Sequence, residues 1–126
     1  MLKDASVNAT LPCSDLERAK RFYGEKLGLT PSSENPGGAF YDQAGGTQFF
    51  LFPSSGRASG THTQMGFSVN DIDAEVRELR SRGIEFEIAD VPGFDKETRI
   101  AENGDVRVAW FKDSEGNLIG LVEQPV

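Results

Sequence analysis

The chain has 126 residues and a mass of 13.7 kDa, with a formal net charge of −7 at pH 7 and a pI near 4.7. No apolar run approaches the roughly 20 residues of a membrane-spanning helix, and an acidic chain repels phosphate backbones, so neither a membrane nor a nucleic-acid partner is expected. Its single cysteine, Cys13, excludes an internal disulfide and a cysteine-based zinc site.

The first half of the chain has the pattern of a strand, a helix and three more strands. Alternation over residues 7–11 predicts the first strand, and apolar spacing over 16–27 predicts an amphipathic helix that Gly28 ends. Ser14 or Asp15 is a suitable N-cap, because its side-chain oxygen accepts hydrogen bonds from free first-turn amides. Three further strands are expected at residues 29–33, 39–42 and 48–52.

The second half repeats this pattern. Residues 63–72 align with 7–16 at a shift of 56, and 116–121 align with 46–51 at a shift of 70. The strand–helix–three-strand order therefore occurs twice. Asn70 or Asp71 should cap the second helix, which ends at Gly83. Strands are expected at residues 84–88, 106–112 and 118–122.

The shift grows from 56 to 70 along the repeat, because the second half contains an insertion. Most of the extra residues fall in 90–104, which has the composition of a long loop. This loop is either a lid that presents Phe94 to a cavity or a solvated excursion. We expect one domain over residues 1–126, built from modules 1–53 and 61–126 and joined by the polar linker 54–60.

The period of two along each strand assigns residues to the two faces of a curved sheet. Apolar positions such as Leu11 and Phe49 should pack under the helices, together with Thr63 and Met65. Trp110 is the ring best suited to stack on a planar ligand or a cation. The other residues expected to face the concave side and bind a ligand are Asn8, Thr10, Gln48, Phe50, Phe52, His62, Gln64 and Gly120.

Three motifs follow one another along the chain. They are SDLERAKRFY at 14–23 followed by LGL at 27–29, FSVNDI at 67–72, and WFKDSEGN at 110–117. Together they resemble the vicinal oxygen chelate superfamily of glyoxalases, bleomycin resistance proteins and extradiol dioxygenases. The resemblance implies an α+β fold in which two βαβββ modules form a curved mixed sheet around a shared cavity, commonly completed in a dimer.

Metal-using relatives take one ligand from each of four strands, usually histidine, glutamine or glutamate. By this resemblance the four positions fall on Asn8, Phe50, Gln64 and Gly120. The repeat independently pairs Asn8 with Gln64, and Phe50 with Gly120. Amides are weak donors for divalent metals, and a phenyl ring or a glycine offers none. We therefore expect a cavity with no metal and no cofactor.

Two reactive side chains outside the four metal-ligand positions, His62 and Cys13, each allow two interpretations. His62, the only histidine, either binds a ligand or shuttles a proton at the concave side, or merely ends its strand. If a metal is bound after all, His62, Glu102 and Asp105 are the expected ligands. Cys13 precedes a helix, which lowers a thiol pKa, but a buried structural cysteine is favoured.

These observations favour a metal-free small-molecule-binding protein that sequesters an aromatic or cationic organic compound. Whether the protein is an enzyme stays open at this point. The alternative is a lyase, isomerase or dioxygenase of the same superfamily with a relocated or absent metal, and a third reading is a regulatory or structural module without a ligand. We expect a cytoplasmic location, since residues 1–10 lack the features of a signal peptide, and the resemblance implies a homodimer.

Overall fold

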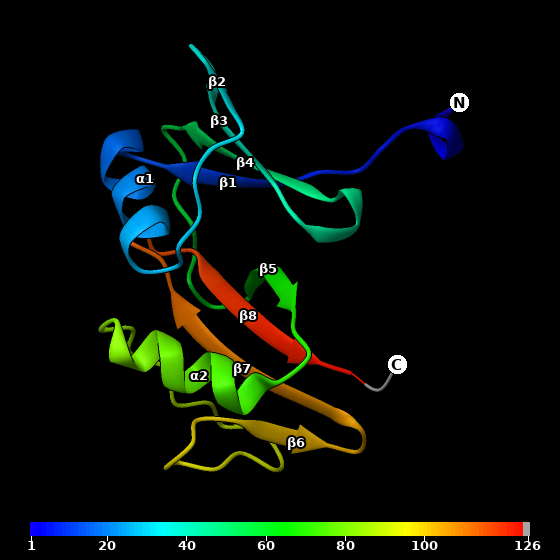
Figure 1. The fold of residues 1–126 in the computed structure, drawn as a ribbon, viewed down its shortest axis with the longest axis vertical. Coiled ribbons are helices and arrows are strands. Elements are labelled where there is room, and N and C mark those ends of the chain that lie inside the picture. Colours follow the sequence, from blue (N-terminus) through cyan, green and yellow to red (C-terminus); the bar gives the residue numbers. More distant parts are fainter. Residues whose placement is uncertain (125–126) are drawn as a thin grey trace.

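Two four-stranded mixed sheets, each covered by one helix, make up the protein (Figure 1). The computed structural model describes residues 1–124, so the last two residues of the predicted module 61–126 lie outside the described part. The first sheet contains β1 (Ala9–Cys13), β4 (Gln48–Pro53), β3 (Gly38–Asp42) and β2 (Ser33–Asn35), in that spatial order, with α1 (Leu16–Glu25). The second contains β5 (Thr63–Ser68), β8 (Leu118–Glu123), β7 (Val106–Lys112) and β6 (Ala101–Asn103), with α2 (Ile72–Ser81).

The two sheets repeat one topology. In each, the first strand of the module lies at one edge of the sheet and pairs in parallel with the last strand, β1 with β4 and β5 with β8, and the remaining pairs are antiparallel. A parallel pair requires a long crossover, and the remaining strands supply it together with the helix. The predicted α+β fold of two βαβββ modules is confirmed.

Both helices begin at an aspartate. The side chain of Asp15 accepts a hydrogen bond from the amide of Arg18 at 3.0 Å, and Asp71 accepts one from Ala74 at 3.1 Å. Of the two N-cap candidates at each helix, the aspartate is therefore the cap and not the preceding Ser14 or Asn70. No helix among residues 1–124 is long and apolar enough to cross a membrane.

Gly24 and Gly28, at the end of α1, should respond to alanine with opposite signs. Gly24 is exposed, and a Cβ there would meet only the Leu29 carbonyl oxygen at 3.8 Å, so Gly24→Ala should stabilise the protein by about 0.5–1 kcal/mol. Gly28 has a φ of +72°, where a Cβ is strained, so Gly28→Ala should destabilise it by about 1 kcal/mol. Urea unfolding of the two variants measures both values, and equal signs would contradict this account.

Two strands differ from their predicted positions. Residues 84–88 form no strand, and only Phe86 bridges to Phe111 of β7. The strand that borders β7 is instead β6, which lies inside the segment predicted as a loop, and Phe94 bridges to Ala101 there. The apolar alternation of 84–88 reflects packing of Ile84 and Phe86 into the core, where both are buried, without a continuous hydrogen-bonded ladder. The strand expected at residues 29–33 is also displaced: β2 begins only at Ser33 and ends at Asn35.

A single hydrophobic core runs through both modules. It contains the apolar faces of strands from both sheets and of both helices, including Leu11, Tyr23, Leu51, Ile72 and Ile119, all fully buried. The expected alternation holds on β4 and β8, where Phe49 and Leu51, or Ile119 and Leu121, point into the core and their neighbours point away. The faces turned away from the helices are thus free for another role.

On β5 the alternation is interrupted by a bulge. Thr63 pairs with Leu118 and Met65 with Ile119, so Gln64 has no partner on β8. An inserted residue changes the face of everything on one side of it. The prediction that Thr63 packs under a helix is therefore wrong: Thr63 lies on the helix-free face. Without the bulge, Gln64 would pair with Leu118 of β8, and Thr63 makes this pairing instead.

Candidate functional site

The helix-free face of the first sheet carries an aromatic stack. Phe50 on β4 stacks on Phe40 of β3, with ring centroids 4.2 Å apart and an interplanar angle of 27°. Phe52 continues the row at 5.8 Å and 10° from Phe50. All three rings are half-buried. Two of them, Phe50 and Phe52, belong to the predicted site, and Phe40 is an addition that the register of β3 against β4 brings to the same face.

The helix-free face of the second sheet carries the only tryptophan. Trp110 on β7 lies opposite Gly120 of β8, and its indole Nε1 donates a hydrogen bond to Thr63 Oγ1 at 3.1 Å. A Cβ built on Gly120 would lie 3.3 Å from Thr63 Cγ2 and 3.7 Å from Trp110 Cδ1. A Cβ at position 120 would thus be tight against Thr63 and in ordinary van der Waals contact with the indole, so a side chain larger than alanine would displace Trp110.

A cavity of about 300 Å³ lies beside this indole. Trp110, Thr63 and Leu118 form its sheet side, and His62 lies at its edge next to the linker. Glu87, Ile88, Ala89 and Val91, from the segment between α2 and β6, also line it. Phe94 does not line this cavity, because it is bridged to β6 instead.

The other predicted site residues are dispersed. Asn8 and Thr10 are exposed, and Thr10 lies beside Phe50 in the parallel pairing. Gln48 donates from Nε2 to Asp42 Oδ1 at 2.7 Å, and His62 Nδ1 lies 2.9 Å from Ser59 Oγ. The structure thus brings together His62 with Trp110, and Phe50 with Phe52, but the cavity beside Trp110 is lined by only His62 and Trp110 of the predicted site residues.

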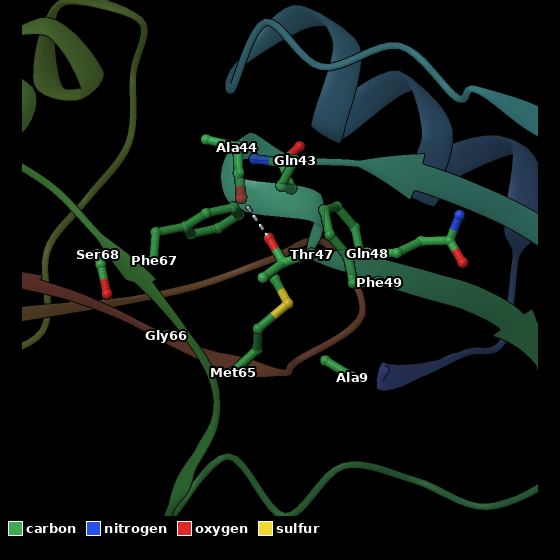
Figure 2. Close-up of a pocket in the computed structure, with 10 residues that line it drawn as sticks. All are labelled: Ala9, Gln43, Ala44, Thr47, Gln48, Phe49, Met65, Gly66, Phe67 and Ser68. Carbon is green, nitrogen blue, oxygen red and sulfur yellow. Dashed lines mark hydrogen bonds between the residues drawn. The ribbon is translucent and has the colours of Figure 1, made fainter. Parts of the chain in front are cut away.

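A cavity lined by both modules does exist, at the junction of the two sheets (Figure 2). It measures about 330 Å³ and lies between the start of β4, with the turn before it, and the edge strand β5. Gln48 is the only predicted site residue that lines it. We refer to it below as the junction cavity.

On the other side of the junction, the turn between β7 and β8 bonds to the beginning of α1. Glu115 Oε1 accepts hydrogen bonds from the amides of Ser14 at 3.0 Å and Asp15 at 3.1 Å, and Arg18 Nε donates to Oε2 at 2.8 Å. Burial alone would raise the pKa of Glu115, but the hydrogen bonds from Arg18, Ser114 and these amides outweigh it and lower the pKa to about 2. The carboxylate is thus held ionised between the two modules.

The same turn places two further polar side chains against the first module. Asp113, only 6% exposed, accepts a hydrogen bond from the Tyr23 hydroxyl at 2.7 Å, and Asn117 donates to the carbonyl oxygen of Pro12 at 3.1 Å. Burial, followed by the Asp113 charge, raises the pKa of Tyr23 well above its usual value. We call these contacts of Asp113, Glu115 and Asn117 with the first module the polar seam. The D-x-E-G-N motif carries all three residues, but its sequence alone does not indicate what they bind.

Cys13 has the structural role favoured by the sequence. It is buried, and its thiol donates to the Phe52 carbonyl oxygen at 3.2 Å. Burial, aided by the charges of Glu115, Asp113 and Asp15, raises the pKa of this thiol to about 11. A thiol that stays protonated at neutral pH is a poor nucleophile.

The profile of the Glyoxalase/Bleomycin resistance protein/Dioxygenase superfamily matches residues 6–121. The chain belongs to this superfamily. The three sequence motifs and their order therefore identify it correctly. Among curated relatives, the uncharacterized protein YurT of Bacillus subtilis (strain 168) is 29% identical over 126 residues, which is 87% of this chain and 91% of YurT.

Solved structures of superfamily members share the fold. TnmS3, described as an antibiotic binding protein from Streptomyces sp. CB03234, has a TM-score of 0.66 at 24% identity and covers 97% of this chain and 98% of its own. The fosfomycin resistance protein FosX of Listeria monocytogenes, in complex with Mn(II) and a dihydroxypropylphosphonic acid, has a TM-score of 0.67 at 16% identity, over 98% of this chain and 92% of its own. At these identities the likeness concerns the fold.

Some superfamily members use a metal ion, and the residues of this chain do not fit one. At the four positions carried over from the metal-using relatives, the ring of Phe50 is stacked between two other rings and Gly120 is covered by an indole. In the substitute set of His62, Glu102 and Asp105, Glu102 pairs with Arg107 at 2.9 Å and His62 lies beside Ser59. Within residues 1–124, no three His, Cys, Asp or Glu side chains are grouped so that they could hold a metal.

Proposed function

We propose that this protein binds and sequesters a small planar aromatic cation without using a metal. The observation that carries the proposal is the replacement of metal-ligand positions by aromatic surface: Phe50 stands within a row of three stacked rings, and Gly120 lies under Trp110. Half-buried rings bind flat apolar molecules by stacking and bind cations through the negative faces of their π systems.

The charges near these rings favour a cationic compound. The whole chain carries −7, so its field attracts cations and repels anions. Glu87 lines the cavity beside Trp110, and its carboxylate lies 3.6 Å from Lys112 Nζ, which leaves it only loosely paired. A ligand cation over the indole would lie close to this carboxylate. That an antibiotic binding protein shares the fold supports sequestration as the role.

The proposal extends to the state of the protein in the cell. We propose a cytoplasmic homodimer, as the family resemblance and the sequence suggest. Size-exclusion chromatography with light scattering, at several protein concentrations, measures the mass of the particle. A mass of one 13.7 kDa chain at every concentration would overturn this part while leaving the ligand proposal unaffected.

The ligand class is tested with three matched probes. N-methylquinolinium is flat and cationic, quinoline is flat and neutral at pH 7.5, and choline is cationic without a ring. Only native protein binds, so a ligand raises the Tm, and Trp110 is the only tryptophan and reports stacking by fluorescence quenching. We expect the affinity order N-methylquinolinium, quinoline, choline. Equal affinity for choline and N-methylquinolinium, or no response to any probe, would overturn the proposal.

Metal independence is tested separately. We expect the Tm and the affinity for N-methylquinolinium to be the same in EDTA as with added Mn²⁺, Zn²⁺ or Ni²⁺, because the part of the chain from 1 to 124 groups no three His, Cys, Asp or Glu side chains that could bind a metal in the native state. Stoichiometric metal that survives dialysis and is lost in an Asn8→Ala/Gln64→Ala variant would contradict this expectation. It would favour instead the alternative of a lyase, isomerase or dioxygenase.

A further inference from the structure

The internal repeat gives each residue of the polar seam a counterpart on the other side of the junction. The shift of 70 relates Asp113, Glu115 and Asn117 to Gln43, Gly45 and Thr47, and the shift of 56 relates Arg18 and Tyr23 to Ala74 and Leu79. The structure agrees with these shifts, since the buried pairs Phe49 and Ile119, and Leu51 and Leu121, occupy equivalent places on β4 and β8. The two sides of the junction can therefore be compared residue by residue.

The counterparts leave space where the polar seam is filled. The counterpart of Arg18 is Ala74, which has a much shorter side chain. The counterpart of Glu115 is Gly45, where an added Cβ would meet no atom within 4 Å. Gln43 and Thr47, the counterparts of Asp113 and Asn117, both line the junction cavity. A second cavity of about 210 Å³ shares Gln43, Phe67 and Ser68 with the junction cavity, and Leu79, the counterpart of Tyr23, lines it together with Glu75. The side of the junction that carries the polar seam is therefore bonded, whereas Gln43 and Thr47 on the other side border open space.

The lining of the junction cavity is apolar on one side and neutral but polar on the other. Met65 and Phe67 extend from β5 toward the turn before β4, and the ring of Phe49 lies beside Thr47 (Figure 2). Phe49 and Phe67 meet edge to face with centroids 6.1 Å apart. Gln43 and Ser68 add an amide and a hydroxyl, and no lining residue is charged. An uncharged wall does not compensate the desolvation of an ion, whereas amides and hydroxyls both donate and accept hydrogen bonds.

We propose that the junction cavity is a second ligand site, which takes a small neutral molecule with an aromatic body and one amide or hydroxyl group. The ring would lie against Met65, Phe67 and Phe49, and the polar group would bond to Gln43, Thr47 or Ser68. The site lies on a different part of the fold from Trp110 and the phenylalanine row, so it stands independently of the function proposed above. Its volume is at the lower end for small-molecule sites.

The two methionines of the chain make a direct test possible. Met65 lines the cavity and Met1 is fully exposed, so selective ¹³C-methyl labelling of methionine gives one signal for the site and one internal control. Benzamide is the probe, because it is neutral and has one ring and one carboxamide. We expect the Met65 methyl signal to shift and saturate, with half-saturation at roughly 1–10 mM, the usual range for so small a molecule. The Met1 signal should stay in place.

A pair of matched variants tests the location. Ala9 also lines the cavity, and Ala9→Leu places three more carbon atoms in it, whereas Ala5→Leu makes the same change at an exposed residue outside it. Benzamide affinity should fall at least tenfold in Ala9→Leu and stay unchanged in Ala5→Leu. Should Ala9→Leu fold poorly, Thr47→Val keeps the shape and removes one hydroxyl, and it should weaken benzamide binding several-fold.

The outcomes distinguish the two sites. The proposal is overturned if Met65 does not respond to benzamide, if Met1 shifts equally, or if the response persists in Ala9→Leu. It is also overturned if the Met65 signal moves with protein concentration alone, since a second copy of the chain would then occupy the junction. N-methylquinolinium should quench Trp110 and leave Met65 unchanged, so failure of the aromatic-cation site would appear in the fluorescence and not in the methionine spectrum.

Discussion

Glu115→Gln is expected to lower the free energy of unfolding by about 2–4 kcal/mol at pH 7. The Glu115 side chain is only 1% exposed and is bound by Arg18 and by the amides of Ser14 and Asp15. The carbonyl oxygen of a glutamine can still accept hydrogen bonds from the amides of Ser14 and Asp15. Its neutral NH2 group, however, would face the Arg18 guanidinium in place of a carboxylate oxygen. The loss falls on a contact between the modules, so α1 should also show faster amide exchange.

The same residue predicts a pH dependence with a defined sign. The pKa of Glu115 is lowered from 4.5 to about 2 in the folded protein, so its stabilisation is complete above about pH 5 and is lost as the pH falls toward 2. The glutamine variant has no such group. The difference in unfolding free energy between wild type and Glu115→Gln should therefore shrink between pH 6 and pH 3.

Urea unfolding at several pH values measures both effects. Glu85→Gln is the control, because Glu85 is exposed and forms no ion pair with any residue in the range 1–124. It should change stability by less than about 0.5 kcal/mol at any pH. A Glu115→Gln protein as stable as wild type at pH 7, or a difference that does not vary with pH, would show that Glu115 does not hold the modules together.

Gly120→Leu is expected to remove binding of N-methylquinolinium while the protein stays folded. A Cβ at this position already lies 3.3 Å from Thr63 Cγ2, so a leucine side chain must push the indole of Trp110 away and break its hydrogen bond to Thr63. Affinity should fall on the order of 100-fold, and overpacking should lower stability by about 1–3 kcal/mol. The emission maximum of Trp110 should shift even without a ligand.

Gly24→Leu is the matched control for this variant. It makes the same substitution on an exposed position of α1, where a built Cβ meets only one carbonyl oxygen at 3.8 Å. Its affinity for N-methylquinolinium should equal that of wild type. If Gly120→Leu also binds normally while its tryptophan emission has shifted, the ligand does not use the face formed by β7 and β8.

Much of the fold follows from periodicity. The repeat at shifts of 56 and 70 predicts two equivalent modules, and the alternation on β4 and β8 predicts correctly which residues enter the core. Such patterns are reliable because one face of every strand and helix must be buried, so sequence and burial share a period. Residues 84–88 show the limit: burial of Ile84 and Phe86 produces a strand-like alternation without a strand.

The site depends more on details that no local pattern encodes. The bulge at Gln64 turns Thr63 to the helix-free face of β5, and as a result Thr63 and not Gln64 bonds to Trp110. A bulge depends on how two distant strands pair, and the residue that causes it need not be unusual in sequence. Phe40 likewise joins the aromatic row only through the register of β3 against β4.

The sequence by itself determined the superfamily, the two modules and the chemical character of the positions where related proteins hold a metal, because residue identity decides which groups can donate to an ion. Only the tertiary structure decided how the modules meet. Glu115 binds α1 across about 100 residues of chain, whereas Gly45, its counterpart in the repeat, leaves a cavity. Contacts between distant segments depend on how the two modules pack, and that packing has no local sequence signal.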